Sequence, residues 1–169
     1  RNPADGYTLL FGSISTHVTP IFLSKTLPYD PVKDFTPISM VADAMFFVSV
    51  QAKMPVNSVK ELIELARRNP GKLSYSSSGM GSIHQMIGEQ FKQLAGVDIL
   101  HVPYKGAAPA QTAVVAGEVS LSFLGSSAHA LVQSGTLKHL AVLDDRRFPV
   151  FPDVPTINET LPDHQRIGV

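Results

Sequence analysis

The chain has 169 residues, of which 44% are hydrophobic and 17% charged, and it contains no cysteine. This composition is that of a folded globular protein, and the length suffices for one ordinary domain or two small lobes. Lysine plus arginine and aspartate plus glutamate both number 14, so no net charge recruits nucleic acid or an acidic membrane surface. Without cysteine the chain has no disulfides, no thiolate metal site and no cysteine nucleophile.

The N-terminal part of the chain predicts few regular elements. Tyr7 to Phe11 is a compact apolar run that predicts a buried strand, followed by a small polar loop, G-S-I-S-T-H. Val18 to Leu23 predicts a short helix with a proline in its first turn. Leu27 to Pro37 holds three prolines in eleven residues and predicts an ordered irregular connection anchored by two aromatic residues.

From Met45 onward, expected strands and helices alternate with short connections. Capping boxes at Ser58 and Ser82 mark two helix starts, and Gly96 and Gly117 mark two helix ends. This βα repeat predicts an α/β fold with a mainly parallel sheet and helices on both faces. Strands are expected at 45–50, 73–76, 99–102, 119–123 and 140–143, and helices at 59–69, 82–95, 109–116 and 126–133.

The stretch from Leu73 to Leu94 contains a candidate ligand site. It predicts a short strand, a serine and glycine turn, and a helix that begins at Ser82. A helix start carries unpaired N–H donors and a partial positive charge, and glycines let a backbone approach a ligand closely, so this turn is a candidate anion site. The alternative is that its serines and glycines only build a tight connection.

Three small polar loops are expected at one edge of the sheet, namely Ser76 to Ser82, Tyr104 to Ala108 and Gly125 to Ser127. Ligands of open parallel sheets bind outside the carboxyl ends of the strands, where such loops converge. Together with Lys105 these loops predict a cradle of N–H and O–H donors for a carboxylate or phosphate. For Lys105 alone, an exposed lysine without function is favoured over ligand steering.

Signs of catalysis and of metal binding are missing from the sequence. No G-x-S-x-G elbow, H-E-x-x-H motif or phosphate-binding P-loop occurs, and the six histidines are scattered without metal-ligand spacing. Asp144 and Asp145 adjoin two arginines, which favours a solvated surface over a pair of catalytic acids. His84 falls in a first helical turn, where packing or loop support is favoured over ligand contact. We therefore expect no catalytic residue, no metal and no cofactor.

Several segments together resemble a known family. They are D-G-Y-T-L-L at Asp5, L-P-Y-D-P-V-K-D-F-T-P-I at Leu27, S-V-K-E-L-I at Ser58, N-P-G-K-L-S-Y-S-S-S-G-M-G-S at Asn69, H-V-P-Y-K-G-A-A-P-A at His101 and F-P-D-V-P-T at Phe151. In this order they resemble the Bug family, the periplasmic substrate-binding proteins of tripartite tricarboxylate transporters. The resemblance runs from Asp5 to Pro162.

This resemblance implies a type II periplasmic-binding-protein fold whose two lobes close on a small organic anion, such as a di- or tricarboxylate or an aromatic carboxylate. It implies membrane permease subunits as partners and no nucleic acid. Residues 46–143 would form a complete second lobe, with 1–45 and 144–169 as parts of the first. The ligand-binding residues carried over are Ser13, Ser15, Thr16, His17, Ser77, Ser78, Gly79, Gly81, Ser82, His84, Lys105, Gly106, Ala107, Gly125 and Ser126.

The resemblance also implies what this chain lacks. Family members carry a first βα unit before the D-G-Y-T-L segment, and after P-D-V-P-T their chain returns to complete the first lobe. We therefore expect a longer natural protein, periplasmic in a Gram-negative bacterium, whose signal peptide is not in this chain, and weakened ligand binding by this chain alone. An α/β enzyme using Ser82 and His84, and a ligand sensor or adaptor, remain as alternatives.

Overall fold

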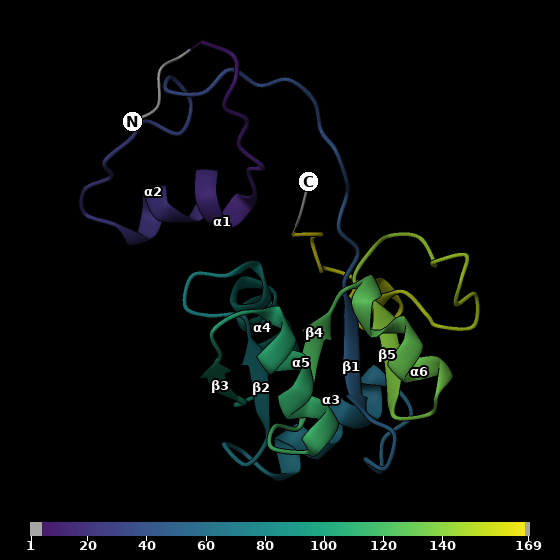
Figure 1. Cartoon of the computed structure of the whole chain (residues 1–169). Helices are drawn as coiled ribbons and strands as arrows, with labels where there is room; N and C mark the ends of the chain where they lie inside the picture. The colour runs from purple at the N-terminus through teal and green to yellow at the C-terminus, as the bar shows by residue number, and fades with distance from the viewer. Residues whose placement is uncertain (1–4, 168–169) are drawn as a thin grey trace. The chain divides into compact units, whose positions relative to one another are not determined.

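A computed structural model describes residues 5–167 of the chain (Figure 1). It divides into two compact units, Arg1–Met40 and Val41–Val169. Residues 1–4 of the expected segment 1–45 and residues 168–169 of the expected segment 144–169 lie outside the described residues. The lobe boundaries inferred from the sequence stay a prediction.

The first unit contains two short helices, α1 (Ile14–His17) and α2 (Thr19–Leu23). The second of these confirms the expected helix, with its proline in the first turn. The strand expected at Tyr7 to Phe11 is wrong, because this run has no regular secondary structure and Tyr7 and Phe11 are 92% and 75% exposed. A strand needs a neighbour for its backbone hydrogen bonds, and no described residue pairs with this run.

The second unit is built on a five-stranded sheet with the order β3-β2-β4-β1-β5 (Figure 1). β2 is parallel to β3 and β4, whereas β1 is antiparallel to both β4 and β5. Four strands therefore run in one direction and β1 runs against them, so the α/β fold is confirmed and its sheet is mixed. The strands are β1 (Phe47–Gln51), β2 (Ser74–Ser77), β3 (Leu100–Pro103), β4 (Leu121–Leu124) and β5 (Leu137–Val142).

Helices cover both faces of this sheet. On one face α3 (Val59–Arg68) and α4 (Ile83–Ala95) bury their apolar sides against Tyr75 and Phe123. On the other, α5 (Ala107–Ala116) and α6 (His129–Gln133) pack around Leu124. Apolar burial on both faces is the main favourable term that holds such a layered fold together.

The helix boundaries follow local signals. Ser58 Oγ accepts a hydrogen bond from Glu61 N at 3.1 Å, and Ser82 Oγ accepts one from Gln85 N at 3.4 Å, which confirms both caps. Gly96 and Gly117 end their helices with positive φ, as expected. The helix expected from Pro109 begins earlier, at Ala107, and the last expected helix is a 3-10 turn, η1 (Ser126–Ala128), followed by α6.

Two close contacts fix the helices on the sheet. Gly88 lies against the ring of Tyr75, where an added Cβ would come within 2.3 Å of the ring. On the other face, Ser76 Oγ bonds to Ser122 Oγ at 2.8 Å and donates to Ala110 O at 2.9 Å, which ties β2 and β4 to α5. These contacts hold α4 and α5 close to the sheet.

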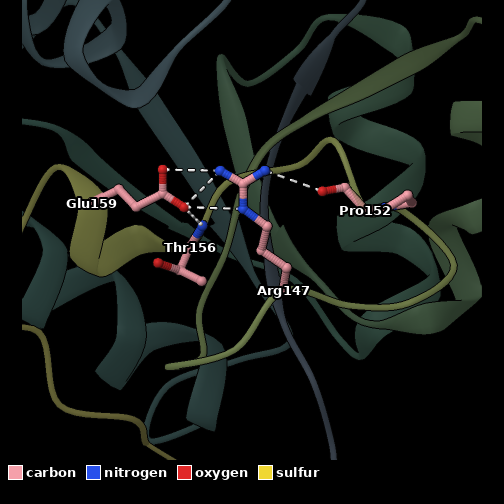
Figure 2. A network of polar contacts seen from close by, with 4 residues as sticks. All are labelled: Arg147, Pro152, Thr156 and Glu159. Carbon is pink, nitrogen blue, oxygen red and sulfur yellow. Dashed lines mark hydrogen bonds and ion pairs between the residues drawn. The ribbon is translucent and has the colours of Figure 1, made fainter.

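The segment after β5 is held together internally by an arginine (Figure 2). The Arg147 guanidinium bonds to the Glu159 carboxylate at 2.9 to 3.1 Å and donates to Pro152 O at 3.2 Å. Glu159 also accepts from Thr156 N at the start of η2 (Ile157–Glu159). A bidentate arginine and carboxylate pair holds a defined geometry, so this segment has a fixed course.

None of the helices within residues 5–167 has the length and apolar character needed to cross a membrane.

Candidate functional site

A cavity of about 410 Å³ lies within the second unit, at the edge where β2 and β4 end. Its volume falls in the range of small-molecule sites. β1 runs opposite to β2 and β4, so the residues that precede β1 reach the same edge. The lining residues are Asp43, Ala44, Met45, Phe46, His84, Ala107, Gln111, Leu124, Gly125, Ser126, Ser127 and Phe148.

The expected site residues fall into three groups. His84, Ala107, Gly125 and Ser126 line the cavity. Those of the first unit lie at α1, where Ser13 is the N-cap and Ser15, Thr16 and His17 are in the helix. The remaining expected residues lie outside the lining, and for all three groups a role in ligand binding stays a prediction. The supporting residues are Ser77, Ser78, Gly79, Gly81, Ser82, Lys105 and Gly106.

Two helix N-termini meet at this cavity, those of α4 and α5. His84 is in the first turn of α4, and Ala107 opens α5. The first N–H groups of a helix have no partner within it and carry a partial positive charge. The backbone of Gly125 to Ser127 lies beside them at the start of η1. Together these backbone groups are candidate N–H donors for an anion.

Side-chain cations contribute nothing directly to this cavity. No lysine or arginine is among the described residues that line it, and Lys105 is exposed elsewhere in its loop. Asp43 is the one charged residue of the described lining, and Arg166 forms an ion pair with it. The same arginine contacts Asp144 at 3.2 Å. The expected solvated surface is therefore wrong for Asp144, which is buried because Arg166 and a backbone N–H satisfy its oxygens.

The serines of the central turn bond to the protein itself. Ser77 Oγ lies 2.6 Å from His101 Nε2, and Ser78 Oγ lies 2.9 Å from His84 Nδ1. Ser82 Oγ caps α4. These hydroxyl groups shape the turn, which agrees with the tight connection expected as one alternative, and the anion cradle stays a prediction.

Glycines let this turn follow its course. Gly79, Gly81 and Gly106 have φ of 135°, 73° and 115°, which strongly favours glycine over residues with a side chain. Gly106 N donates to Ser78 O at 3.2 Å and thereby joins the loop before α5 to the turn before α4. The two helix N-termini are held next to each other by this backbone contact.

His84 is half-buried and has a supporting position. Burial lowers its pKa, since the imidazolium form would lose its hydration. Its ring packs edge-on against Phe46 at 5.3 Å, and its Nδ1 bonds to Ser78. The structure thus agrees with packing and loop support, while the same ring forms part of the cavity wall.

Sequence reasoning missed most of the cavity's apolar side. Met45 and Phe46 reach the edge because β1 is antiparallel, and a short apolar run carries no sign of its direction. Phe148 comes from a proline-rich segment that gives no periodic signal. Leu124 ends a strand whose position was expected but whose last residue was not. In the described part of the chain no group of three or more potential metal ligands occurs.

Solved structures define the class of protein. A protein of R. palustris solved with adipate superposes with a TM-score of 0.93 at 36% identity, covering 99% of this chain and 57% of that chain. The periplasmic binding protein BugD gives 0.84 at 30% identity, covering 91% of this chain and 52% of that chain. MatC of Rhodopseudomonas palustris with bound malate gives 0.83 at 29%, covering 93% and 54%. The fold is that of a periplasmic binding protein, represented here in part.

The family follows from the sequence comparisons. The family described as "Tripartite tricarboxylate transporter family receptor" matches residues 1–165, and the chain belongs to it. BugT of Bordetella pertussis is 32% identical over 94% of this chain and 49% of its own length. A UPF0065 protein of Bordetella bronchiseptica is 34% identical over 94% of this chain and 47% of its own length. The chain spans about half the length of the curated relatives it matches.

Proposed function

We propose that this chain is the ligand-capturing part of an extracytoplasmic solute-binding protein that takes up a small organic carboxylate and delivers it to a tripartite transporter in the membrane. The proposal rests on one observation, that the N-termini of α4 and α5 meet at the cavity. No lysine or arginine is among the described residues that line it. Such a surface binds an anion through backbone N–H groups. Relatives of similar fold were solved with adipate and with malate, which supports a carboxylate as the anion.

The proposed mechanism is conformational. The N–H groups at the starts of α4 and α5 hold one carboxylate, and Ser13, Ser15, Thr16 and His17 supply donors from the first lobe. The lobes close about the chain crossings near β1 and β5, and 144–169 returns toward the first lobe. Ligand favours the closed form only by its higher affinity for that form. The periplasm is the proposed compartment, and the permease is the proposed recipient of the ligand.

A catalytic role for Ser82 and His84 has less support. The Ser82 hydroxyl caps α4, and the His84 Nδ1 is occupied by Ser78. A serine nucleophile requires a base within hydrogen-bond reach, and that base needs an orienting group. Since both side chains serve the local fold, we propose a binding protein without enzymatic activity. A sensor or adaptor role has no observation of its own in its favour.

The proposal is tested by titrating the isotope-labelled chain with acetate, malate and adipate and following its backbone amide resonances by NMR. We expect saturable shifts at Ala107, Gly125 and Ser126, with smaller changes elsewhere. In a longer natural protein, ligand at a hundredfold excess over Kd should add about 2.7 kcal/mol of stability. Turnover of any of these acids that disappears in Ser82→Ala, or shifts that avoid these amides, would refute the proposal.

A further inference from the structure

The cavity has two chemically different sides. One side, which we call the N–H side, is formed by His84, Ala107, Gln111 and Gly125 to Ser127, at or near the starts of α4, α5 and η1. The other, which we call the apolar wall, consists of Met45, Phe46, Leu124 and Phe148. Phe46 and Leu124 are 8% and 4% exposed, so most of their surface is used in the core, while Phe148 is half-buried and keeps ring surface at the cavity.

Phe148 is held in place before any ligand arrives. Its ring packs against Phe47 at 5.7 Å and against His129 at 5.4 Å. Its carbonyl accepts a hydrogen bond from Phe151 N at 2.9 Å. The neighbouring Arg147 is clasped by Glu159 (Figure 2). A side chain that is already ordered loses little entropy when a ligand packs on it.

The charged groups near the cavity limit the ligand further. Asp43 is the carboxylate that could receive an ammonium group, and Arg166 already pairs with it. An amino acid would therefore find no free carboxylate for its ammonium group in the described lining. A ligand hydroxyl placed against the apolar wall would likewise lose its water without gaining a hydrogen bond, which lowers affinity about tenfold or more per buried group.

We propose that Phe148 is a specificity-determining residue, and that with the apolar wall it makes this cavity select carboxylates whose body is apolar and lacks an ammonium group. This inference rests on the proposed carboxylate-binding function. The N–H side holds the carboxylate, and the methylene or ring carbons of the ligand lie on Phe148. Each methylene that leaves water against the wall raises affinity by up to about fourfold.

The test uses acids that share the carboxylate and differ in the body. Acetate, butyrate and hexanoate form a series of increasing length, and gluconate has the chain length of hexanoate with a hydroxyl on each body carbon. Titrations are followed at the amides of Ala107, Gly125 and Ser126. We expect affinity to rise along the series by roughly twofold to fourfold per methylene, and hexanoate to bind about tenfold more tightly than gluconate.

Two variants locate the effect. In Phe148→Ala we expect hexanoate to lose about fivefold to tenfold in affinity while acetate changes by less than about twofold. In Phe148→Leu, which keeps apolar volume, we expect most of the hexanoate affinity to remain. If Phe148→Ala loses the dispersed spectrum of a folded chain, the leucine variant and the ligand series on the unchanged protein decide the question.

The outcomes separate this inference from the proposed function. If acetate binds at the expected amides but hexanoate binds no better than acetate or gluconate, carboxylate binding stands and the role of Phe148 is overturned. An equal loss for acetate and hexanoate in Phe148→Ala overturns it as well, because the ring would then act only by supporting the fold. If no acid shifts these amides, both proposals fail.

Discussion

His139 should make the second unit sensitive to acid. It lies on β5, stacked on Phe47 at a ring distance of 4.3 Å, with Nδ1 2.8 Å from Ser49 Oγ. Its Nε2 is buried and has no partner within the described part of the chain. Burial, with a smaller contribution from nearby His129, lowers its pKa to about 4. The neutral ring fits this site and the imidazolium does not.

The sign and size of the effect follow from proton linkage. The unfolded chain binds a proton at His139 near the ordinary pKa of 6.5, whereas the folded chain resists protonation down to about 4. The unfolded state therefore holds more protons between these values, and the free energy of unfolding falls as pH decreases through this window. With one pKa unit worth about 1.4 kcal/mol, His139 removes about 2 kcal/mol at pH 5 and about 3 kcal/mol at pH 4.

The assay is urea unfolding followed by far-UV circular dichroism at about pH 7 and pH 5, in buffers without carboxylates. His139→Asn supplies a side chain that can keep the bond to Ser49 and does not titrate. The variant should be less stable than the parent at pH 7, since it loses the stacked ring. Its further loss between pH 7 and pH 5 should be about 2 kcal/mol smaller than the parent's. Equal losses of stability in the parent and in His139→Asn would refute this prediction, because they would mean that His139 has the same pKa in the folded and the unfolded state.

Three other substitutions probe the helices and the charge beside the cavity. Gly88→Ala should destabilise the protein by about 1 to 3 kcal/mol in urea unfolding, since the clash with Tyr75 outweighs a helix-propensity gain of about 1 kcal/mol; unchanged stability would mean that the ring moves aside. Arg166→Gln should weaken acetate binding about fivefold in an NMR titration, because Asp43 is then left unpaired beside the anion. Adding Asp43→Asn to this variant should restore acetate binding. If acetate binding is not restored, Arg166 has a purely structural role. Ser58→Ala should cost about 1 kcal/mol in urea unfolding and leave acetate affinity unchanged, since this cap is remote from the cavity; a change in affinity would contradict that separation.

Signals within a few residues of one another were reliable in this sequence. The caps at Ser58 and Ser82 depend on a side chain and a backbone group three residues apart, and both exist in the structure. The left-handed helix ends at Gly96 and Gly117 are equally local. The turn between β2 and α4 was therefore placed correctly from the sequence.

Features that depend on distant partners were not visible. Tyr7 to Phe11 has the composition of a buried strand, but a strand forms only where another strand accepts its hydrogen bonds. The direction of β1 is set by its insertion between β4 and β5, about which its own residues say nothing. Since that direction brings Met45 and Phe46 to the cavity, the apolar wall could not be anticipated either.

The two places where the chain enters and leaves the sheet lie next to each other. Phe46 O accepts a hydrogen bond from Leu143 N at 2.8 Å, so the stretch between them begins and ends at one point. A stretch with adjacent ends can be transplanted or circularly permuted with little change to its interior. New termini could be opened at the exposed turn at Gly135, away from the loops of the cavity, while a short linker joins the old ends. Ile157 lies beyond Leu143 in the chain and is buried in the same core. Such a redesign must therefore retain the segment that contains Ile157.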